Sequence, residues 1–238
     1  MKLRINKRKE TATPRRTPTF SVEKAHQAQL QMSKKIILED RLPAEIRLIA
    51  GIDVAYTRDR SIAAAVTLEY DTLKLVESRT AVTKTLMPYI PTLLSFREIL
   101  PSILSIKKLH LKPDLFLVDG QGLAHPYCCG LASHLGLVIR RPTIGVAKSR
   151  LFGQVENAKT EDAAFLKNDC QIIGAAVTTK QGSKPVYVST GHMVSLKTAI
   201  RIVKACARDN RIPEPLIKAH QIANLEKRKI HIQSHSYD

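Results

Sequence analysis

A short apolar run that ends at a carboxylate constrains this chain more than any other feature. The run Leu115–Val118 stops at Asp119, which is followed by Gly120 and, two positions later, Gly122. A short apolar segment bounded by turn residues predicts a buried strand. Open α/β sheets place their ligand sites at the carboxyl ends of strands, and glycines permit a close approach of backbone or ligand. Asp119 therefore belongs either to a ligand site or to an ordinary Asp-Gly turn.

The composition narrows the class of protein. The chain has 238 residues, 44% of them hydrophobic, which is enough for a substantial domain with its own core. A formal net charge of +17 favours polyanionic partners, nucleic acid before an acidic membrane surface. The four cysteines form no Cys-x-x-Cys pair, and no apolar run reaches the length of a membrane span or of a signal-peptide core. We expect a cytoplasmic protein without a zinc site or a disulfide framework.

The N-terminal stretch differs from the rest of the chain. Residues 1–20 are basic, contain Pro and Thr, and are poor in apolar residues. This composition predicts a flexible arm that is either solvated or in contact with phosphates. Residues 21–238 are expected to form a single domain.

The remaining pattern predicts an α/β fold with a mixed central sheet and helices on its faces. Three successive strands joined by short turns, at 48–56, 61–70 and 73–82, predict an antiparallel meander. Alternating helices and strands follow. The further strands are expected at 115–118, 142–148, 171–179 and 185–189, and the helices at 22–37, from 92 with an interruption near Pro101, at 129–137, at 196–206 and from Pro215 onward.

Asp53 is a second carboxylate in an apolar setting, inside the predicted strand 48–56. A buried carboxylate is costly unless it is paired or bound to a cation. If this strand lies beside the strand of Asp119, the two carboxylates can meet, and a hard divalent metal would relieve their repulsion. The alternative is a surface-facing or hydrogen-bonded Asp.

Five other polar residues are ambiguous from pattern alone. Helical periodicity places Glu98 away from the apolar side of its helix, which predicts exposure to solvent. His220 shares a helical face with three apolar residues and should point inward, as a core or a catalytic histidine. His125 is a site donor or a turn residue, and Lys148 reaches a phosphate or ends a solvated strand. His192 is expected to help start the following helix.

Eight segments occur in order between about residues 22 and 225. They are Ile49–Val54, Pro88–Pro91, Leu94–Glu98, Val118–Pro126, Ala132–Gly136, Pro142–Leu151, Val188–His192 and Arg211–Pro215. Together they resemble endonuclease V, an inosine-directed nuclease family with an RNase H-like fold. The Asp-Gly-Gln-Gly-x-Ala-His-Pro run is the most specific of them.

The resemblance implies a metal-dependent endonuclease. It would act on DNA or RNA that contains inosine. It would cut the second phosphodiester 3′ to the inosine and leave a 3′-hydroxyl and a 5′-phosphate. Mg²⁺ is the implied cofactor, Mn²⁺ would also support activity, and a monomer is expected. The implied metal-binding acids are Asp53, Glu98 and Asp119, and the other catalytic groups are Lys148 and His220.

The resemblance also implies the substrate contacts. A wedge would enter the duplex beside the lesion, and a second segment would hold the extruded hypoxanthine. The wedge is Pro88, Tyr89, Ile90 and Pro91, and the base contacts are Gly120, Gln121, Gly122 and His125.

Two positions depart from the family's usual pattern. Thr92 stands where a glycine commonly follows Pro-Tyr-Ile-Pro, and Tyr127 stands where an arginine commonly follows His-Pro. Both lie near the implied recognition loops, so they bear on lesion range more than on hydrolysis.

Two other functions are compatible with a basic chain of this fold. One is another RNase H-like nuclease that cleaves hybrids or junctions, although it would have no reason to carry Asp-Gly-Gln-Gly-x-Ala-His-Pro. The other is a non-catalytic nucleic-acid-binding protein, which the loss of an implied metal-binding acid would have favoured. All three acids are present.

Overall fold

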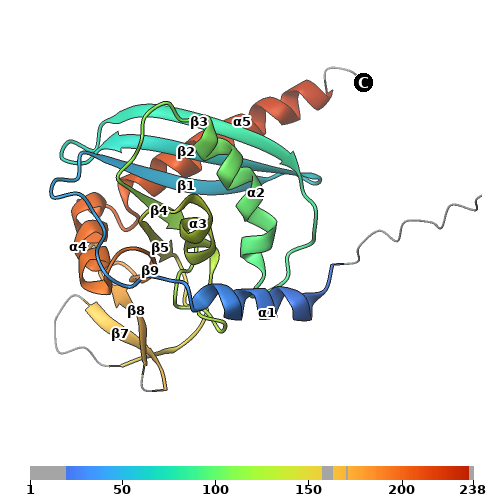
Figure 1. Cartoon of the computed structure of the whole chain (residues 1–238). Coiled ribbons are helices and arrows are strands. Elements are labelled where there is room, and N and C mark those ends of the chain that lie inside the picture. The colour runs from blue at the N-terminus through green and yellow to red at the C-terminus, as the bar shows by residue number, and fades with distance from the viewer. Residues whose placement is uncertain (1–19, 157–162, 170, 236–238) are drawn as a thin grey trace, which may run out of the picture.

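The computed structural model describes residues 20–156, 163–169 and 171–235, and within them nine strands form one sheet in the order β3-β2-β1-β4-β5-β9-β8-β7-β6 (Figure 1). The strands are β1 Leu48–Tyr56, β2 Arg60–Glu69, β3 Leu75–Lys84, β4 Leu115–Asp119, β5 Thr143–Ala147, β6 Gln154–Val155, β7 Ala163–Asn168, β8 Gln171–Val177 and β9 Val186–His192. The helices are α1 Val22–Ser33, α2 Leu94–Lys107, α3 Leu131–Ile139, α4 Leu196–Ala207 and α5 Glu214–His235. The predicted arm falls almost entirely outside the described residues.

The centre of the sheet has the predicted topology. Strands β1, β2 and β3 form an antiparallel meander, and β4 lies parallel to both β1 and β5. Ile52 of β1 pairs with Val118 of β4, which brings Asp53 and Asp119, one position further along each strand, to the same edge of the sheet. The two strands are therefore neighbours, which is the condition under which the sequence allowed the two carboxylates to meet.

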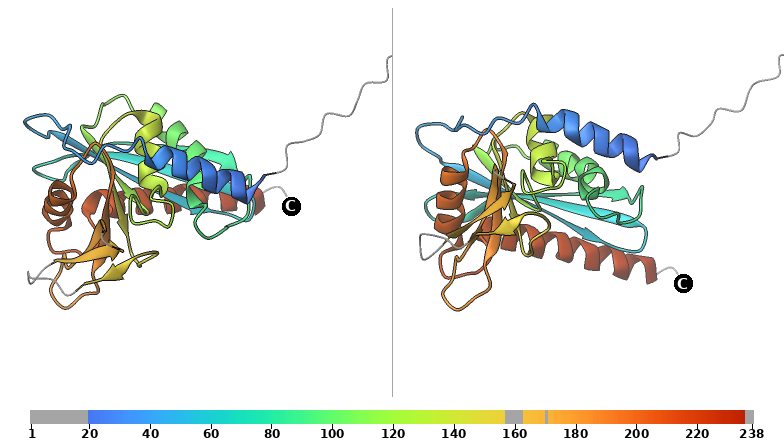
Figure 2. Two further views of the ribbon diagram at one scale, coloured as in Figure 1. Left: turned by 60° about the horizontal axis from the view of Figure 1, so that its bottom comes forward. Right: turned by 90° about the horizontal axis from the view of Figure 1, so that it is seen from below.

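Two apolar clusters hold the layers together. On one face, Ile49 and Leu117 pack with Val203 of α4 and Leu216 of α5. On the opposite face, residues of β1 and β4 pack with α3 and with apolar side chains of α2. The sheet is therefore covered by helices on both faces, as predicted (Figure 2).

Helix α2 differs from its prediction because it continues through Pro101. A proline inside a helix removes one backbone hydrogen bond and clashes with the preceding turn, at a cost of about 3 kcal/mol. Ile99, Ile103 and Ile106 on both sides of the proline pack against the sheet. Tertiary packing thus keeps the helix continuous where the local sequence predicts an interruption.

Helix α1 ends at Ser33, four residues earlier than predicted, because the next backbone groups pair elsewhere. The N–H of Ile37 donates to Nδ1 of His192, and its carbonyl accepts from Met193. His192 accordingly ends β9 and does not start α4. Ser195 caps that helix by accepting from the N–H of Thr198.

No helix in the described ranges has both the length and the apolar character needed to cross a membrane. Strands β6 and β7 were not expected from the sequence. Strand β6 has only two residues, both exposed, and most residues of β7 are half-buried. The alternation that identifies a strand with one buried face is therefore weak in both.

Candidate active site

Two carboxylates lie where the pairing between β1 and β4 ends, Asp53 within β1 and Asp119 at the end of β4. Oδ2 of Asp53 lies 2.7 Å from Nδ1 of His220, and Oδ1 accepts from the N–H of Val54. Oδ2 of Asp119 lies 2.5 Å from Nζ of Lys148, directly after β5. The structure thus brings four of the sequence-predicted residues together from two strands, a strand end and a helix.

His220 does not point into the core, which corrects the sequence-based expectation. Its side chain is 59% exposed, whereas Leu216 and Ala219 on the same helix are buried. Helix α5 comes so close to β1 that a Cβ at Gly51 would collide with the carbonyl of Pro215. The histidine lies where the helix passes the active edge of the sheet, so it faces Asp53 and solvent.

Asn224 is a site residue that the sequence reading missed. Its Nδ2 lies 3.1 Å from Nε2 of His220 and donates to the carbonyl of the same residue. With the amide as donor, Nε2 accepts and the proton of the neutral ring sits on Nδ1, toward Asp53. The i, i+4 spacing of the two residues on a helix was the only available signal.

Glu98 is buried, contrary to the prediction of a solvent-exposed side chain. Its Oε1 accepts from the hydroxyl of Tyr56 at 2.6 Å, and the Arg97 guanidinium lies 4.2 Å from the centre of the Tyr56 ring. The prediction from helical periodicity was wrong because serines make up much of the buried side of α2, while Leu100 is exposed. Serines let the helix lie close to the sheet, and hydrophobic periodicity cannot detect such a face.

The three carboxylates influence one another's charge. Burial, opposed by the Tyr56 hydrogen bond and reinforced by Asp53 and Asp119, raises the pKa of Glu98 to about 8. Burial and the charge of Asp53 also raise the pKa of Asp119, although Lys148 opposes the shift. Clustered acids with raised pKa values mark a site short of positive charge.

This charge deficit fits a divalent cation, and carboxylate oxygens are the ligands that such hard cations prefer. As the side chains are placed, no three His, Cys, Asp or Glu residues of the described chain converge as ligands on one point. Each carboxylate is instead turned toward its own partner, His220, Lys148 or Tyr56. The fit therefore rests on the donor chemistry and the charges.

A pocket of about 320 Å³ adjoins the carboxylates. Asp119 and Lys148 line it together with Tyr89, Gln121 and His125. Nε2 of Gln121 donates to the carbonyl of Ser149, whereas its Oε1 is buried without a hydrogen-bond partner. An unpaired buried acceptor is costly, so it indicates a place for a donor.

The chain's relatives decide its family. The family model of endonuclease V matches residues 30–221. This chain belongs to the endonuclease V family. The endonuclease V of Thermofilum pendens is 42% identical over 224 residues, which cover 91% of this chain and 96% of that protein. The endonuclease V of Trichormus variabilis is 41% identical over 210 residues, 86% of this chain and 95% of that protein.

Solved endonuclease V structures share the fold. The enzyme from Streptomyces avermitilis superposes with a TM-score of 0.83 at 37% identity, covering 89% of this chain and 95% of that one. The Ciona intestinalis enzyme, solved with a 24mer DNA containing an inosine followed by a ribo-adenosine, gives 0.78 at 33% identity over 88% and 98% of the two chains. The protein is thus a nuclease, a hydrolase of phosphodiester bonds from a metal-dependent family, and the predicted RNase H-like mixed sheet is confirmed.

The backbone N–H groups of Gly120 and Gly122 are not free to bind a ligand. The N–H of Gly120 donates to the carbonyl of Val146, and that of Gly122 donates to Oγ of Ser189. Both donors are therefore already used within the protein. A Cβ at Gly122 would collide with the carbonyl of Thr190, so this glycine is required for packing.

His125 likewise uses both ring nitrogens within the protein. Nε2 donates to the carbonyl of Thr92 at 2.9 Å, and Nδ1 accepts from the N–H of Tyr127. Burial lowers the pKa of His125 to about 4, so the ring is neutral at physiological pH. It lines the pocket but is engaged in joining two loops.

The predicted wedge is an exposed loop next to that junction. Tyr89, Pro88 and Pro91 are exposed and Ile90 is half-buried. Thr92, directly after them, has a φ of 71°, which favours glycine and explains why glycine suits this position.

The strained Thr92 is tied to α1. Its hydroxyl lies 2.9 Å from Nε2 of His26, and its carbonyl accepts from Gln29. The His26 ring also stacks on Tyr127, with centroids 4.1 Å apart. The two departures from the family pattern therefore meet at one histidine of α1.

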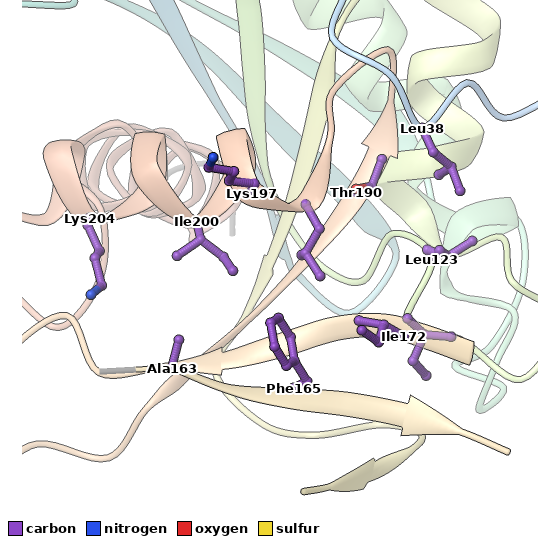
Figure 3. Close-up of a pocket in the computed structure, with 11 residues that line it drawn as sticks. Leu38, Leu123, Ala163, Phe165, Ile172, Thr190, Lys197, Ile200 and Lys204 are labelled. Carbon is purple, nitrogen blue, oxygen red and sulfur yellow. The ribbon is translucent and has the colours of Figure 1, made fainter. Parts of the chain in front are cut away.

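A separate apolar pocket of about 760 Å³ lies between α4 and strands β7 and β8 (Figure 3). Phe165, Ile172 and Ile200 point into it. It contains none of the sequence-predicted site residues, whereas Asp119, Gln121 and Lys148 all line the smaller pocket.

Proposed function

We propose that this endonuclease V cleaves nucleic-acid strands containing inosine, at the second phosphodiester 3′ to the inosine, and leaves a 3′-hydroxyl and a 5′-phosphate. Mg²⁺ is the proposed cofactor, and Mn²⁺ also supports the reaction. The observation that carries the proposal is that Asp119 and Lys148 belong both to the acidic site and to the wall of the adjoining pocket. A base held in the pocket would keep its own strand beside the carboxylates.

The pocket offers chemistry that suits hypoxanthine. Hypoxanthine carries a hydrogen on N1, whereas N1 of adenine is an acceptor. The unpaired Oε1 of Gln121 would accept that hydrogen, and it would face a lone pair in the case of adenine. Sites built around such a bond reject the analogue that lacks it. Gly120, Gly122 and His125 would shape the walls of this pocket.

Reading the base requires that it leave the stack, which costs least for a mispaired inosine. Tyr89, flanked by Pro88, Ile90 and Pro91, would fill the space that the extruded base vacates. Its exposed ring lies on the pocket's rim, and two prolines limit the freedom of the loop that carries it.

The hydrolytic groups take separate tasks. Asp53, Glu98 and Asp119 would hold the metal, which supplies an activated water and offsets charge on the phosphate. The ammonium of Lys148, whose pKa Asp119 raises against the effect of burial, would steady the scissile phosphate or the leaving oxygen. His220, held by Asp53 and Asn224 with its ring exposed, would orient the attacking water.

We also propose that residues 21–238 act as one domain and that the protein works as a monomer in the cytoplasm. The nine-stranded sheet, which joins strands from residue 48 to residue 192, supports the single domain. The free thiols of Cys128, Cys129 and Cys206 agree with a reducing compartment.

A cleavage panel tests the proposed function. Inosine is placed in single-stranded DNA, duplex DNA and single-stranded RNA, with Mg²⁺, Mn²⁺ or Ca²⁺, and an RNA–DNA hybrid and a junction without inosine are included. We expect cuts only near inosine, and none by Asp53→Asn, which should still bind the inosine strand. Cleavage of the hybrid or junction without inosine would favour the other RNase H-like activity. Full Mg²⁺-dependent activity of Asp53→Asn would refute the metal assignment.

A further inference from the structure

A basic groove lies beside the active edge of the sheet, at the turn between β1 and β2. It has a volume of about 1210 Å³ and is bounded by residues 56–60 on one side and residues 227–232 of α5 on the other. Of the ten residues that line it, four are Lys or Arg and one is Asp. The groove therefore carries an excess of positive charge on two separate elements.

Several of these cations are open to a ligand. Arg58 and Arg228 are exposed, and Arg60 has only a long contact of 3.9 Å to Asp59. No side-chain hydrogen bond or ion pair joins Arg58 or Arg228 to another of the described residues. Cations without internal partners are available to bind an anion at little cost in lost interactions.

The groove is held in shape. In the β1–β2 turn, the N–H of Thr57 donates to the carbonyl of Arg60, and the N–H of Arg60 donates to the Thr57 hydroxyl. The carbonyl of Asp59 also accepts from Thr85 at the end of β3. On the other side, α5 runs alongside the meander strands as one continuous helix (Figure 2). Both walls are therefore pre-organised.

The groove continues from the catalytic residues. Tyr56 lines it and also donates to Glu98, and α5 carries both His220 and the cationic wall. Arg228 lies eight residues beyond His220, which is about 12 Å along a helix that rises 1.5 Å per residue. Along a B-form duplex, whose strands rise about 3.4 Å per nucleotide, this distance corresponds to roughly three or four nucleotides.

We propose that this groove binds the backbone phosphates of the substrate strand about three or four nucleotides away from the cleaved bond. The proposal rests on the proposed function for its position relative to the cut. The contact itself is electrostatic and independent of sequence, so it would hold inosine-containing and undamaged strands equally. The match to the family model ends at residue 221, so the cationic wall of α5 is a feature of this chain beyond that match.

The test compares two double variants of equal charge change. Arg58→Gln with Arg228→Gln removes two cations of the groove. Lys74→Gln with Lys112→Gln removes two exposed lysines at the opposite edge of the sheet, where the β2–β3 turn and the start of β4 lie. Affinity for single-stranded oligonucleotides with and without inosine is measured by fluorescence anisotropy over a range of salt concentrations.

We expect the groove variant to lose affinity on the order of tenfold on both kinds of strand, and its salt slope to become shallower by about 1.4, or about 0.7 per lost phosphate contact. Cleavage by saturating protein in a single turnover should stay within about twofold, because the carboxylates are untouched. The control variant should change little. Equal losses in the two variants would overturn the proposal.

Trimming the oligonucleotide supplies a second readout. In one set of strands, fewer than three nucleotides remain on one side of the cut. The unaltered protein should bind these short strands less tightly than the long ones. The groove variant should bind short and long strands equally well. Equal losses for both proteins would overturn the proposal. A lack of inosine preference would instead contradict the proposed function. The measurements on undamaged strands would still test the groove. Should the double variant lower the melting temperature, Arg228→Gln alone, at an exposed helix position, must show half the change in slope.

Discussion

At the scale of single residues, Thr92 shows how an unfavourable backbone conformation is held in place. A non-glycine residue in the left-handed region costs roughly 1 kcal/mol, and here His26, Gln29 and His125 all bond to Thr92. His26→Ala should lower the free energy of unfolding by about 1 kcal/mol and weaken the preference for inosine, because the wedge loop loses an anchor. In a Thr92→Gly background, where the strain and the hydroxyl are both gone, the same change should cost less.

Urea titrations of the four proteins in this cycle measure the coupling, and cleavage of matched inosine and adenine strands measures the preference. A coupling of at least about 0.5 kcal/mol is expected for residues in contact. Strictly additive effects would show that His26 acts on Tyr127 alone, through the ring stacking, and not on the loop.

Glu98 gives a residue-scale prediction about pH. Its pKa is about 8 in the folded protein, against an ordinary value of 4.5. The folded state therefore binds more protons than the unfolded state between these values, and the stability of the metal-free protein should fall as pH rises from about 4.5 to 8. Glu98→Gln, which keeps an acceptor for Tyr56, should remove this fall and be more stable at pH 8 by roughly 2–4 kcal/mol.

The measurement is the free energy of unfolding in the presence of a chelator at pH 5 and at pH 8. If the free energy of unfolding changed equally between pH 5 and pH 8 in the two proteins, the electrostatic account of the site would be contradicted. Mg²⁺ should restore stability at pH 8 to the unaltered protein more than to Glu98→Gln, because the ionised carboxylate is the better ligand.

The position of a single residue could be predicted from the sequence where the pattern of one strand determined it. Asp53 and Asp119 interrupt apolar strands, so their place at a sheet edge followed from alternation and length. The burial of Glu98 could not be predicted in this way, because serines make up much of the buried side of its helix. The left-handed backbone of Thr92 was also beyond prediction, since a departure from a pattern does not reveal a dihedral angle.

At the scale of elements, Glu77 of β3 joins the edge of the meander to the loop between α2 and β4. Its buried carboxylate accepts from the N–H groups of His110 and Leu111 and pairs with Arg79 at 2.9 Å. Burial alone would raise the pKa of Glu77, but these partners outweigh it and lower the pKa. Glu77→Gln should destabilise the protein at pH 7 by about 1–3 kcal/mol, the usual worth of hydrogen bonds to a charged group.

The sign of the pH effect follows from the lowered pKa. The contribution of Glu77 is fully present above the ordinary carboxyl pKa near 4.5 and is lost as pH falls through the lower folded value. The difference between the two proteins should therefore shrink at pH 3. Glu45→Gln is the control, because its pair with Arg47 is 71% and 80% exposed and should be worth at most about 0.5 kcal/mol. An equal effect of the two substitutions would refute the structural role of Glu77.

Elements were predictable in proportion to their burial. The meander and β4 have strong patterns and lie where expected. The interruption expected at Pro101 was wrong because local preference does not include the packing of α2 on the sheet. Strands β6 and β7 were missed because neither shows a clear alternation of buried and exposed residues. The end of α1 depended on the backbone of Ile37 finding partners 155 residues away, which no local signal contains.

At the scale of the whole molecule, the proposed chemistry gathers at one edge of the sheet. Asp53 lies within β1, Asp119 ends β4 and Lys148 follows β5, and α5 passes the same edge with His220. The sequence allowed Asp53 and Asp119 to meet if their strands were neighbours, and only the family resemblance added Lys148 and His220 to the site. It could not predict the basic groove, since the groove joins a turn to a helix that lies about 170 positions further along the chain.

The overall charge of +17 leads to the last prediction, which concerns binding in salt. If about five phosphates of a single strand are neutralised, log K should fall with log salt concentration at a slope of about −3.5, so affinity should drop on the order of a hundredfold between 50 and 200 mM salt. The proposed base contact is the buried, neutral amide of Gln121, so its contribution should not change with salt. The ratio of affinities for inosine and undamaged strands should then stay constant while both affinities fall. Anisotropy titrations of the two strands at four salt concentrations measure both quantities. A flat response would remove the electrostatic account of binding, and a ratio that falls with salt would place the inosine preference in the charged residues and not in the pocket.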